Sequence, residues 1–317
     1  MIRMAERDGI GISTAWPRLV LLIMLVLLSA MSCVRAEPPL RVVLVLSDTS
    51  EVYREVAQAF ETSLTGRFSL RTYLLGEPDL ASWPAEAALM VTVGAKATRA
   101  AGARLEEAGP VLALLVPRDL APLAERGSAV YVDQPPERYL AFVRMVMPKA
   151  RKVGVLVSGE GSLGMRVYAA TAARQGLELV VGTAANRLEV PRVLQGILAE
   201  VDVLMLIPDT EVVNEYTVRQ ILIASYRQKI PVIGFSRGLA HAGAVASLVS
   251  SPSAIGRQGA ALAKQWNPAT GALPPAAYAD DYEMIFNRQV ARSLDVALPG
   301  DPDTLESWRR LLSAVNR

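Results

Sequence analysis

The sequence predicts an α/β fold made of two lobes, each built on a parallel β-sheet, which are joined by a hinge. First, short apolar runs alternate with helical patterns along the chain from residue 40 onward. Second, these runs are continuously apolar, which is typical of parallel strands covered by helices on both faces. Third, the alternation occurs in two successive series of roughly 110 and 125 residues, which favours two domains over one long sheet.

The first series predicts an N-terminal lobe. It begins with the apolar run LRVVLVL, and the later runs are similarly short and lie between helical patterns or turns. The expected strands are Leu40–Leu46, Phe68–Leu75, Ala88–Val93, Val111–Val116 and Ala129–Val132. The expected helices are Glu51–Leu64, Ala95–Glu107 and Pro136–Met147.

The second series predicts a C-terminal lobe of the same construction. It begins with the apolar run KVGVLV and again alternates strands with amphipathic helices. The expected strands are Lys152–Val157, Leu177–Val181, Val201–Ile207, Pro231–Phe235 and Ala244–Val249. The expected helices are Met165–Gln175, Val190–Glu200, Val212–Gln228 and Ala254–Trp266.

The expected domain boundaries follow from breaks in this pattern. A proline and a short charged cluster, Pro148-Lys149-Ala150-Arg151, separate an apolar helix from a new strand. Residues 37–148 are therefore expected to form the N-terminal lobe, and residues 149–275 the C-terminal lobe. Residues 276–317 predict a strand followed by helices, and we expect them to cross back to the N-terminal lobe. Repeated crossing between two lobes makes a hinge.

Residues 1–36 predict a secretory signal peptide. The apolar run Leu19–Leu28 follows several arginines and precedes small residues, which is the layout of an export signal. A membrane-spanning helix is the alternative, but the run is shorter than the roughly 20 apolar residues that a span needs. Cleavage after Ala36 would give a soluble periplasmic protein. The segment Ala30-Met31-Ser32-Cys33 also resembles a lipobox, in which Cys33 would carry a lipid anchor.

Charge and composition argue against several classes of function. The 33 basic and 31 acidic residues fall to 29 of each without residues 1–36, which hold four Arg and two acids. A chain without net charge or a basic cluster is poorly suited to nucleic acid or to a peripheral membrane surface. The only histidine, His241, excludes a metal site with several histidines and argues against histidine-based catalysis. We expect neither a cofactor nor a metal.

Two short motifs typical of enzymes occur, and we interpret both as accidental. Residues 159–164 satisfy G-x-G-x-x-G after a strand, but no acidic residue ends the next strand to bind a ribose. Residues 234–238 satisfy G-x-S-x-G, but His241 lies too close along the chain to act as a base for Ser236. We interpret the first motif as a loop at the edge of a cleft, and Ser236 as a polar residue at a strand end.

Residues 201–263 carry a resemblance to a known family. They contain a strand ending in Pro208-Asp209-Thr210, a helix, the sequence IPVIGFS, and Ile255-Gly256-Arg257-Gln258 at a helix start. In these features the chain resembles the ABC-transporter substrate-binding family, whose better-known relatives bind aromatic amino acids such as tryptophan or tyrosine. The resemblance implies a type I periplasmic binding protein fold, with two Rossmann-like lobes, a hinge of crossing strands and a ligand in the cleft between the lobes.

The candidate ligand-binding residues are polar residues that follow strands, because ligands of open α/β sheets bind outside the carboxyl ends of the strands. The candidates are Asp48, Ser50, Thr92, Gly94, Lys96 and Arg118 in the N-terminal lobe, and Ser158, Glu160, Asp209, Thr210, Ser236 and Arg237 in the C-terminal lobe. Arg118 could bind a ligand carboxylate through its planar fork, or form a surface salt bridge. Asp209 could bind a ligand ammonium, or cap a helix that begins at Val212.

Together these observations predict an exported solute-binding protein that closes two lobes over a small, amino-acid-like ligand and catalyses no reaction. Its expected partner is the membrane permease of an ABC transporter, or a membrane signalling protein that responds to the same closure. An enzyme on the same α/β scaffold is one alternative, but it would need a histidine or metal-ligand cluster at the strand ends. A structural cell-envelope protein is another, but it would not need polar residues after so many strands.

Overall fold

The structure is a computed structural model, which describes residues 38–77, 89–103, 109–120, 127–159 and 164–314. The predicted signal peptide, both predicted cleavage sites, Cys33 and Glu160 lie outside the described residues. Internal contacts divide the chain into residues 1–39 and 40–317, and the second unit holds both lobes. Within the described part of the chain, no helix is long and apolar enough to cross a bilayer.

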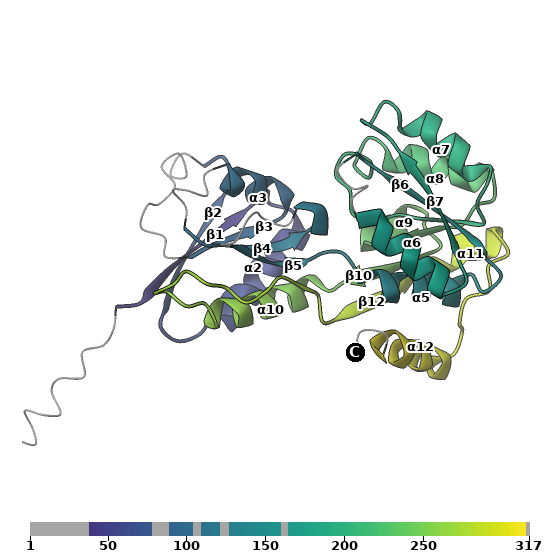
Figure 1. The fold of residues 1–317 in the computed structure, drawn as a ribbon. Coiled ribbons are helices and arrows are strands. Elements are labelled where there is room, and N and C mark those ends of the chain that lie inside the picture. The colour runs from purple at the N-terminus through teal and green to yellow at the C-terminus, as the bar shows by residue number, and fades with distance from the viewer. Residues whose placement is uncertain (1–37, 78–88, 104–108, 121–126, 160–163, 315–317) are drawn as a thin grey trace, which may run out of the picture. The chain divides into compact units, whose positions relative to one another are not determined.

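The N-terminal lobe is built on a six-stranded parallel sheet in the order β11-β5-β4-β3-β1-β2 (Figure 1). Its strands are β1 (Leu40–Leu46), β2 (Phe68–Leu74), β3 (Leu89–Val93), β4 (Val111–Val116), β5 (Gly127–Tyr131) and β11 (Ala277–Tyr278). Its helices are α2 (Glu51–Ser63), α3 (Ala95–Gly102) and α10 (Pro252–Lys264), with a short turn of 3₁₀ helix at Arg118–Leu120. Every residue of β3 and β4 is buried, which explains why β4 is continuously apolar and β3 is apolar except at Thr92.

The C-terminal lobe is built on a second six-stranded sheet in the order β12-β10-β9-β8-β6-β7, in which only β12 runs antiparallel to its neighbour. Its strands are β6 (Lys152–Val157), β7 (Glu178–Thr183), β8 (Val203–Met205), β9 (Val232–Gly234), β10 (Ala246–Ser250) and β12 (Tyr282–Phe286). Its helices are α5 (Pro136–Val146), α6 (Met165–Arg174), α7 (Val190–Leu198), α8 (Val218–Arg227), α9 (Arg237–Ala242), α11 (Arg288–Ser293) and α12 (Pro302–Ala314). The two sheets with interleaved helices confirm the predicted fold class.

The predicted helix 212–228 is shorter than expected, because α8 begins only at Val218. Polar side chains hold residues 209–217 in turns. Thr217 Oγ1 donates to the Val212 carbonyl oxygen at 2.6 Å, and Asn214 Nδ2 donates to the Thr210 carbonyl oxygen at 3.1 Å. Such local side-chain bonds compete with helical backbone bonds, and hydrophobic periodicity does not detect them.

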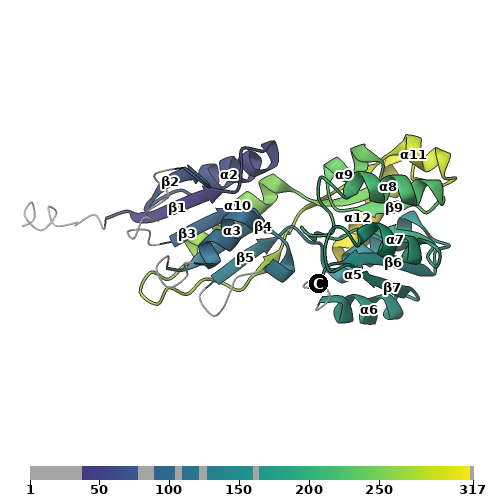
Figure 2. The same cartoon turned by 90° about the horizontal axis from the view of Figure 1, so that it is seen from above.

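Two helices belong to the lobe opposite the one expected from their position in the sequence. Helix α5 packs in the core of the C-terminal sheet, although residues 37–148 were expected to form the N-terminal lobe. Helix α10 lies beside α2 in the N-terminal lobe, as Figures 1 and 2 show, although residues 149–275 were expected to form the C-terminal lobe. A Cβ on Gly256 would lie 2.3 Å from the Val56 carbonyl oxygen, so glycine permits this close approach.

The chain therefore crosses between the sheets after β5, after β10 and between β11 and β12. The expected return of residues 276–317 holds only for β11, because β12 pairs with β10 and both α11 and α12 pack on the C-terminal sheet. Ser250 Oγ accepts a hydrogen bond from Gln134 Nε2 at 2.7 Å and donates one to the Val132 carbonyl oxygen at 2.8 Å. These bonds join the first crossing segment to the second.

Candidate functional site

The carboxyl ends of the strands carry the candidate site, as topology predicts for an open α/β sheet. A small pocket at these ends is lined from both lobes. Its lining residues are Arg99, Pro117, Leu120, Ser158, Asp209, Thr210 and Glu211. The pocket brings together the ends of β4, β6 and β8 and the helix α3. Three of the predicted residues, Ser158, Asp209 and Thr210, lie in this lining.

A polar and aromatic cluster stands at the carboxyl ends of β4, β5 and β11. The Arg118 guanidinium donates to the Tyr278 hydroxyl at 3.0 Å and lies 5.9 Å from the centre of that ring. The backbone N–H of Arg118 donates to the Asp133 carboxylate at 2.7 Å. Tyr131 meets Tyr278 edge to face, with ring centroids 5.4 Å apart. We call Arg118, Tyr131, Asp133 and Tyr278 the Arg118 cluster.

The surroundings of the Arg118 cluster are desolvated, while Arg118 itself is exposed. Burial raises the pKa of Tyr131 and of Tyr278 above the ordinary value, although the nearby Arg118 charge acts in the opposite direction. Asp133 is only 8% exposed. An exposed guanidinium beside two tyrosine rings offers a fork for a carboxylate and an apolar surface for the group that carries it.

The family is decided by comparison with known proteins. Residues 133–301, more than half of the chain, match the family model described as ABC transporter substrate binding protein. The chain belongs to this family. No curated protein matches the sequence.

Solved structures agree with this substrate-binding fold. An ABC domain from Streptococcus pneumoniae in complex with L-Trp is 12% identical, and the match covers 84% of this chain and 98% of that one with a TM-score of 0.62. A conserved domain protein from Vibrio cholerae is 18% identical over 84% of this chain and 97% of its own, also with a TM-score of 0.62. A ligand-free, open substrate-binding protein with adhesive properties from Clostridium difficile is 17% identical over 83% of this chain and 97% of its own, with a TM-score of 0.63.

Asp209 of this substrate-binding protein has a structural role. Its carboxylate accepts hydrogen bonds from the backbone N–H groups of Ser158 at 2.7 Å, Glu211 at 3.0 Å and Val212 at 3.1 Å. The side chain is only 4% exposed, and three of its roughly four acceptor positions are occupied. Asp209 therefore ties the end of β6 to the turn after β8, which favours the predicted capping role over the binding of a ligand ammonium.

Thr210 remains accessible beside that turn. Its hydroxyl accepts a hydrogen bond from the Arg99 guanidinium at 3.1 Å. Arg99 lies one turn along α3 from Lys96, the exposed residue that the sequence analysis selected. Periodicity marks the exposed face of a helix, but it does not tell which residue of that face approaches the other strand ends.

Two candidates at the carboxyl end of β3 are part of the framework rather than of an accessible site. Thr92 is fully buried, and its hydroxyl is 2.8 Å from that of Thr98, so the expectation that Thr92 contacts ligand is corrected. Gly94 has a φ of 87°, and a Cβ there would lie 2.7 Å from the Tyr53 ring. Gly94 thus admits the ring of Tyr53. Ser47 Oγ accepts the backbone N–H of Ala97 at 2.9 Å at the start of α3.

The candidates after β1 stand at the surface of the N-terminal lobe. Asp48 is half-buried, and its carboxylate accepts the backbone N–H of Ser50 at 2.8 Å. Ser50 occupies the N-cap position of α2, but its side chain makes no capping bond. The Ser50 hydroxyl is exposed. Burial raises the pKa of the neighbouring Tyr53, and the Asp48 charge adds to that rise.

The candidates after β9 are committed to other contacts. Ser236 Oγ accepts the backbone N–H of Leu239 at 3.2 Å and caps α9, so the G-x-S-x-G segment forms a helix start. Arg237 pairs with Glu283 and, at 3.3 Å, with Glu55. The hydrogen bond with Glu283 is the main cause of a raised Arg237 pKa. Two carboxylates already surround this guanidinium, so a ligand would compete with Glu283 and Glu55 for Arg237.

Sequence reasoning missed Tyr131, Asp133 and Tyr278. The short strand β11 places Tyr278 opposite Tyr131 in the parallel register with β5. Asp133 lies two residues beyond β5, in the first crossing segment. Because Asp133 follows a strand, the rule used for the other candidates could have selected it from the sequence. Among the described residues, no group of three or more His, Cys, Asp or Glu side chains could hold a metal ion.

Proposed function

We propose that this substrate-binding protein captures an amino-acid-like ligand in the periplasm and delivers it to the membrane permease of an ABC transporter. Members of the family bind small ligands for such transporters. The observation that carries the amino-acid assignment is the Arg118 cluster, in which an exposed guanidinium stands beside the rings of Tyr131 and Tyr278.

The chemistry of the cluster suits a carboxylate attached to an apolar or aromatic group. A guanidinium can donate two parallel hydrogen bonds to a carboxylate. Tyrosine rings can pack edge to face or offset against a second ring. The Streptococcus pneumoniae structure contains L-Trp, and the similarity of fold supports an amino acid as the ligand class here.

Thermal unfolding of the exported protein in the presence of a ligand panel tests this proposal. The panel comprises the twenty amino acids, small organic acids without an amino group, nucleosides and sugars. A ligand that binds only the folded state and is present at 100 times its dissociation constant adds about 2.7 kcal/mol of stability. For a chain of this size, that corresponds to a rise of roughly 5 °C or more in the unfolding temperature.

The panel separates the parts of the proposal. A rise with one or a few amino acids supports both capture and the ligand class. A rise only with a sugar or nucleoside refutes the amino-acid assignment and retains capture of a small ligand. No rise with any member of the panel contradicts the proposal as a whole.

A further inference from the structure

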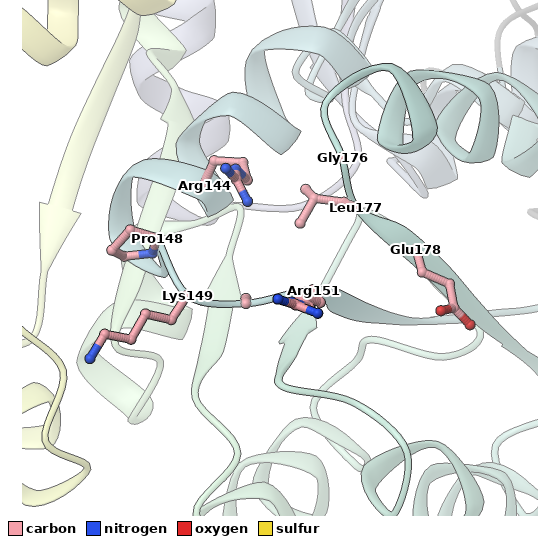
Figure 3. A pocket seen from close by; sticks show the side chains of 8 residues that line it. Arg144, Pro148, Lys149, Arg151, Gly176, Leu177 and Glu178 are labelled. Carbon is pink, nitrogen blue, oxygen red and sulfur yellow. The ribbon is translucent and has the colours of Figure 1, made fainter.

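The C-terminal lobe has a second hollow, at the amino end of β6 and thus at the edge of the sheet opposite the candidate ligand site. It is open to solvent and has a volume of about 730 Å³. The lining residues are Arg144, Pro148, Lys149, Ala150, Arg151, Gly176, Leu177 and Glu178 (Figure 3). Four of them form the segment Pro148-Lys149-Ala150-Arg151, which was predicted to separate the two lobes. Because the chain crosses between the sheets elsewhere, this charged segment does not mark the boundary.

Backbone hydrogen bonds hold the loops around this hollow. The Asp202 carboxylate accepts the backbone N–H groups of Arg151 at 2.7 Å and Lys152 at 2.9 Å. The backbone N–H of Glu178 donates to the Arg151 carbonyl oxygen at 2.8 Å. Buried Leu177 and Ala150 supply an apolar base. The exposed side chains of the hollow therefore project from a well-supported backbone.

The charges that line the hollow are unbalanced. Arg144, Lys149 and Arg151 are exposed cations, and Glu178 is the one acidic lining residue. Figure 3 shows Glu178 directed away from Arg144, and its carboxylate pairs with Lys152 at 3.6 Å. Among the described residues, no carboxylate lies within salt-bridge distance of the three cations.

The neighbouring acid, Asp202, offsets only part of this excess, because its single negative charge faces both Arg151 and Lys152. Asp202 uses its carboxylate to accept the two backbone N–H groups, and these bonds are the main cause of its lowered pKa. The charges of Lys152 and Arg151 lower that pKa further. The hollow thus presents three cations around an apolar base, although the chain without its predicted signal peptide has no net charge.

We propose that this hollow binds a phosphate group. Two guanidinium forks and an ammonium match the anionic oxygens of a phosphate monoester or diester, and guanidinium forms paired hydrogen bonds with such oxygens. Leu177 and Pro148 can contact the organic part that carries the phosphate. The site is independent of the proposed amino-acid site, because it lies at the opposite ends of the strands. A soluble phosphate ester and an anionic lipid headgroup share this chemistry.

Two probes distinguish these sources. Calorimetric titration of the exported protein with glycerol 3-phosphate measures binding of a soluble ester. Sedimentation with phosphatidylglycerol vesicles, compared with phosphatidylcholine vesicles, measures binding to an anionic lipid headgroup. Binding of either probe should weaken as NaCl rises, because the contacts are between exposed charges.

A triple variant, Arg144→Gln with Lys149→Gln and Arg151→Gln, tests the residues. Its matched control is Arg219→Gln with Arg227→Gln and Arg292→Gln, which removes the same charge from exposed positions elsewhere in the lobe. Each cation near an anionic surface contributes about fivefold in affinity, so the triple variant should lose vesicle binding by roughly 100-fold while the control does not. Thermal unfolding of both variants verifies that they fold.

The results of the two binding assays decide whether the hollow binds phosphate and from which source. Vesicle binding alone assigns the site to a lipid headgroup, and glycerol 3-phosphate binding assigns it to a soluble ester, provided that only the triple variant loses the interaction. If the wild-type protein binds neither probe, or if the triple and control variants lose binding equally, the proposed phosphate site is refuted.

Discussion

Replacement of Asp209 tests whether the loop after β8 depends on one buried carboxylate. The side chain accepts three backbone N–H groups at 2.7 to 3.1 Å and is 4% exposed. A hydrogen bond to a charged group contributes about 1.5–3 kcal/mol, and bonds that share one carboxylate are not additive. Asp209→Ala should therefore lower the free energy of unfolding by about 3–5 kcal/mol.

Asp209→Asn should cost less, about 2 kcal/mol, because its amide oxygen can still accept two of the three N–H groups. If the amide oxygen stays with Glu211 and Val212, the amide NH₂ group would face the backbone N–H of Ser158, and two donors would oppose each other. Urea unfolding followed by circular dichroism measures these losses. Exposed Glu215 in the same turn provides the control, and Glu215→Gln should change stability by no more than about 0.5 kcal/mol.

Two results would refute this reasoning. A loss below about 1 kcal/mol in Asp209→Ala would mean that the three amides are readily satisfied by water. An Asp209→Asn protein that keeps wild-type stability but loses amino-acid affinity would restore the role suggested by the sequence, in which Asp209 binds a ligand ammonium.

Three further predictions follow from particular contacts. Gly256→Ala should destabilise the protein by about 1–3 kcal/mol, because the new Cβ clashes with α2. The control is Gly196→Ala, in open space on α7, which should stabilise the protein by up to about 1 kcal/mol in the same unfolding assay. Stabilisation by both substitutions would contradict the close packing of α10. Asp202→Asn should lower stability at pH 7, because a carboxyl with a lowered folded-state pKa stabilises the folded protein above its unfolded pKa of about 3.9. The stability difference between wild type and variant should shrink as the pH falls through the folded pKa. Unfolding measured across pH would disprove this if that difference stayed constant. Tyr278→Phe removes the acceptor for Arg118 and should change amino-acid affinity about 2- to 12-fold by titration, while an unchanged affinity would place the ligand elsewhere.

The sequence was sufficient to predict the fold class and most of the strands and helices. Strands such as β4 are apolar at every position because helices cover both faces, and this pattern is local. The lobe to which a helix belongs is not determined by its local sequence pattern. Helix α10 packs on α2, where Gly256 permits the close approach of the two backbones, and helical periodicity does not reveal this partner.

The candidate site was only partly predictable for a related reason. The rule that ligands bind at strand ends selects Arg118 and Thr210, and the structure places both as exposed residues after strands. It did not reveal that the Asp209 carboxylate is occupied by backbone amides. It also gave no means of finding Tyr278, because the two-residue strand β11 joins the N-terminal sheet from the far end of the chain.

Calorimetric titration of the wild-type protein and of Arg118→Gln with the amino acid that most raises the unfolding temperature tests the central claim most directly. Exposed Arg219→Gln serves as the control for loss of one positive charge. If Arg118 binds the ligand carboxylate, its replacement should weaken binding by about 10- to 100-fold, and the control should bind as the wild type does. Equal affinity in Arg118→Gln and the wild type would contradict an amino-acid site built on the Arg118 cluster.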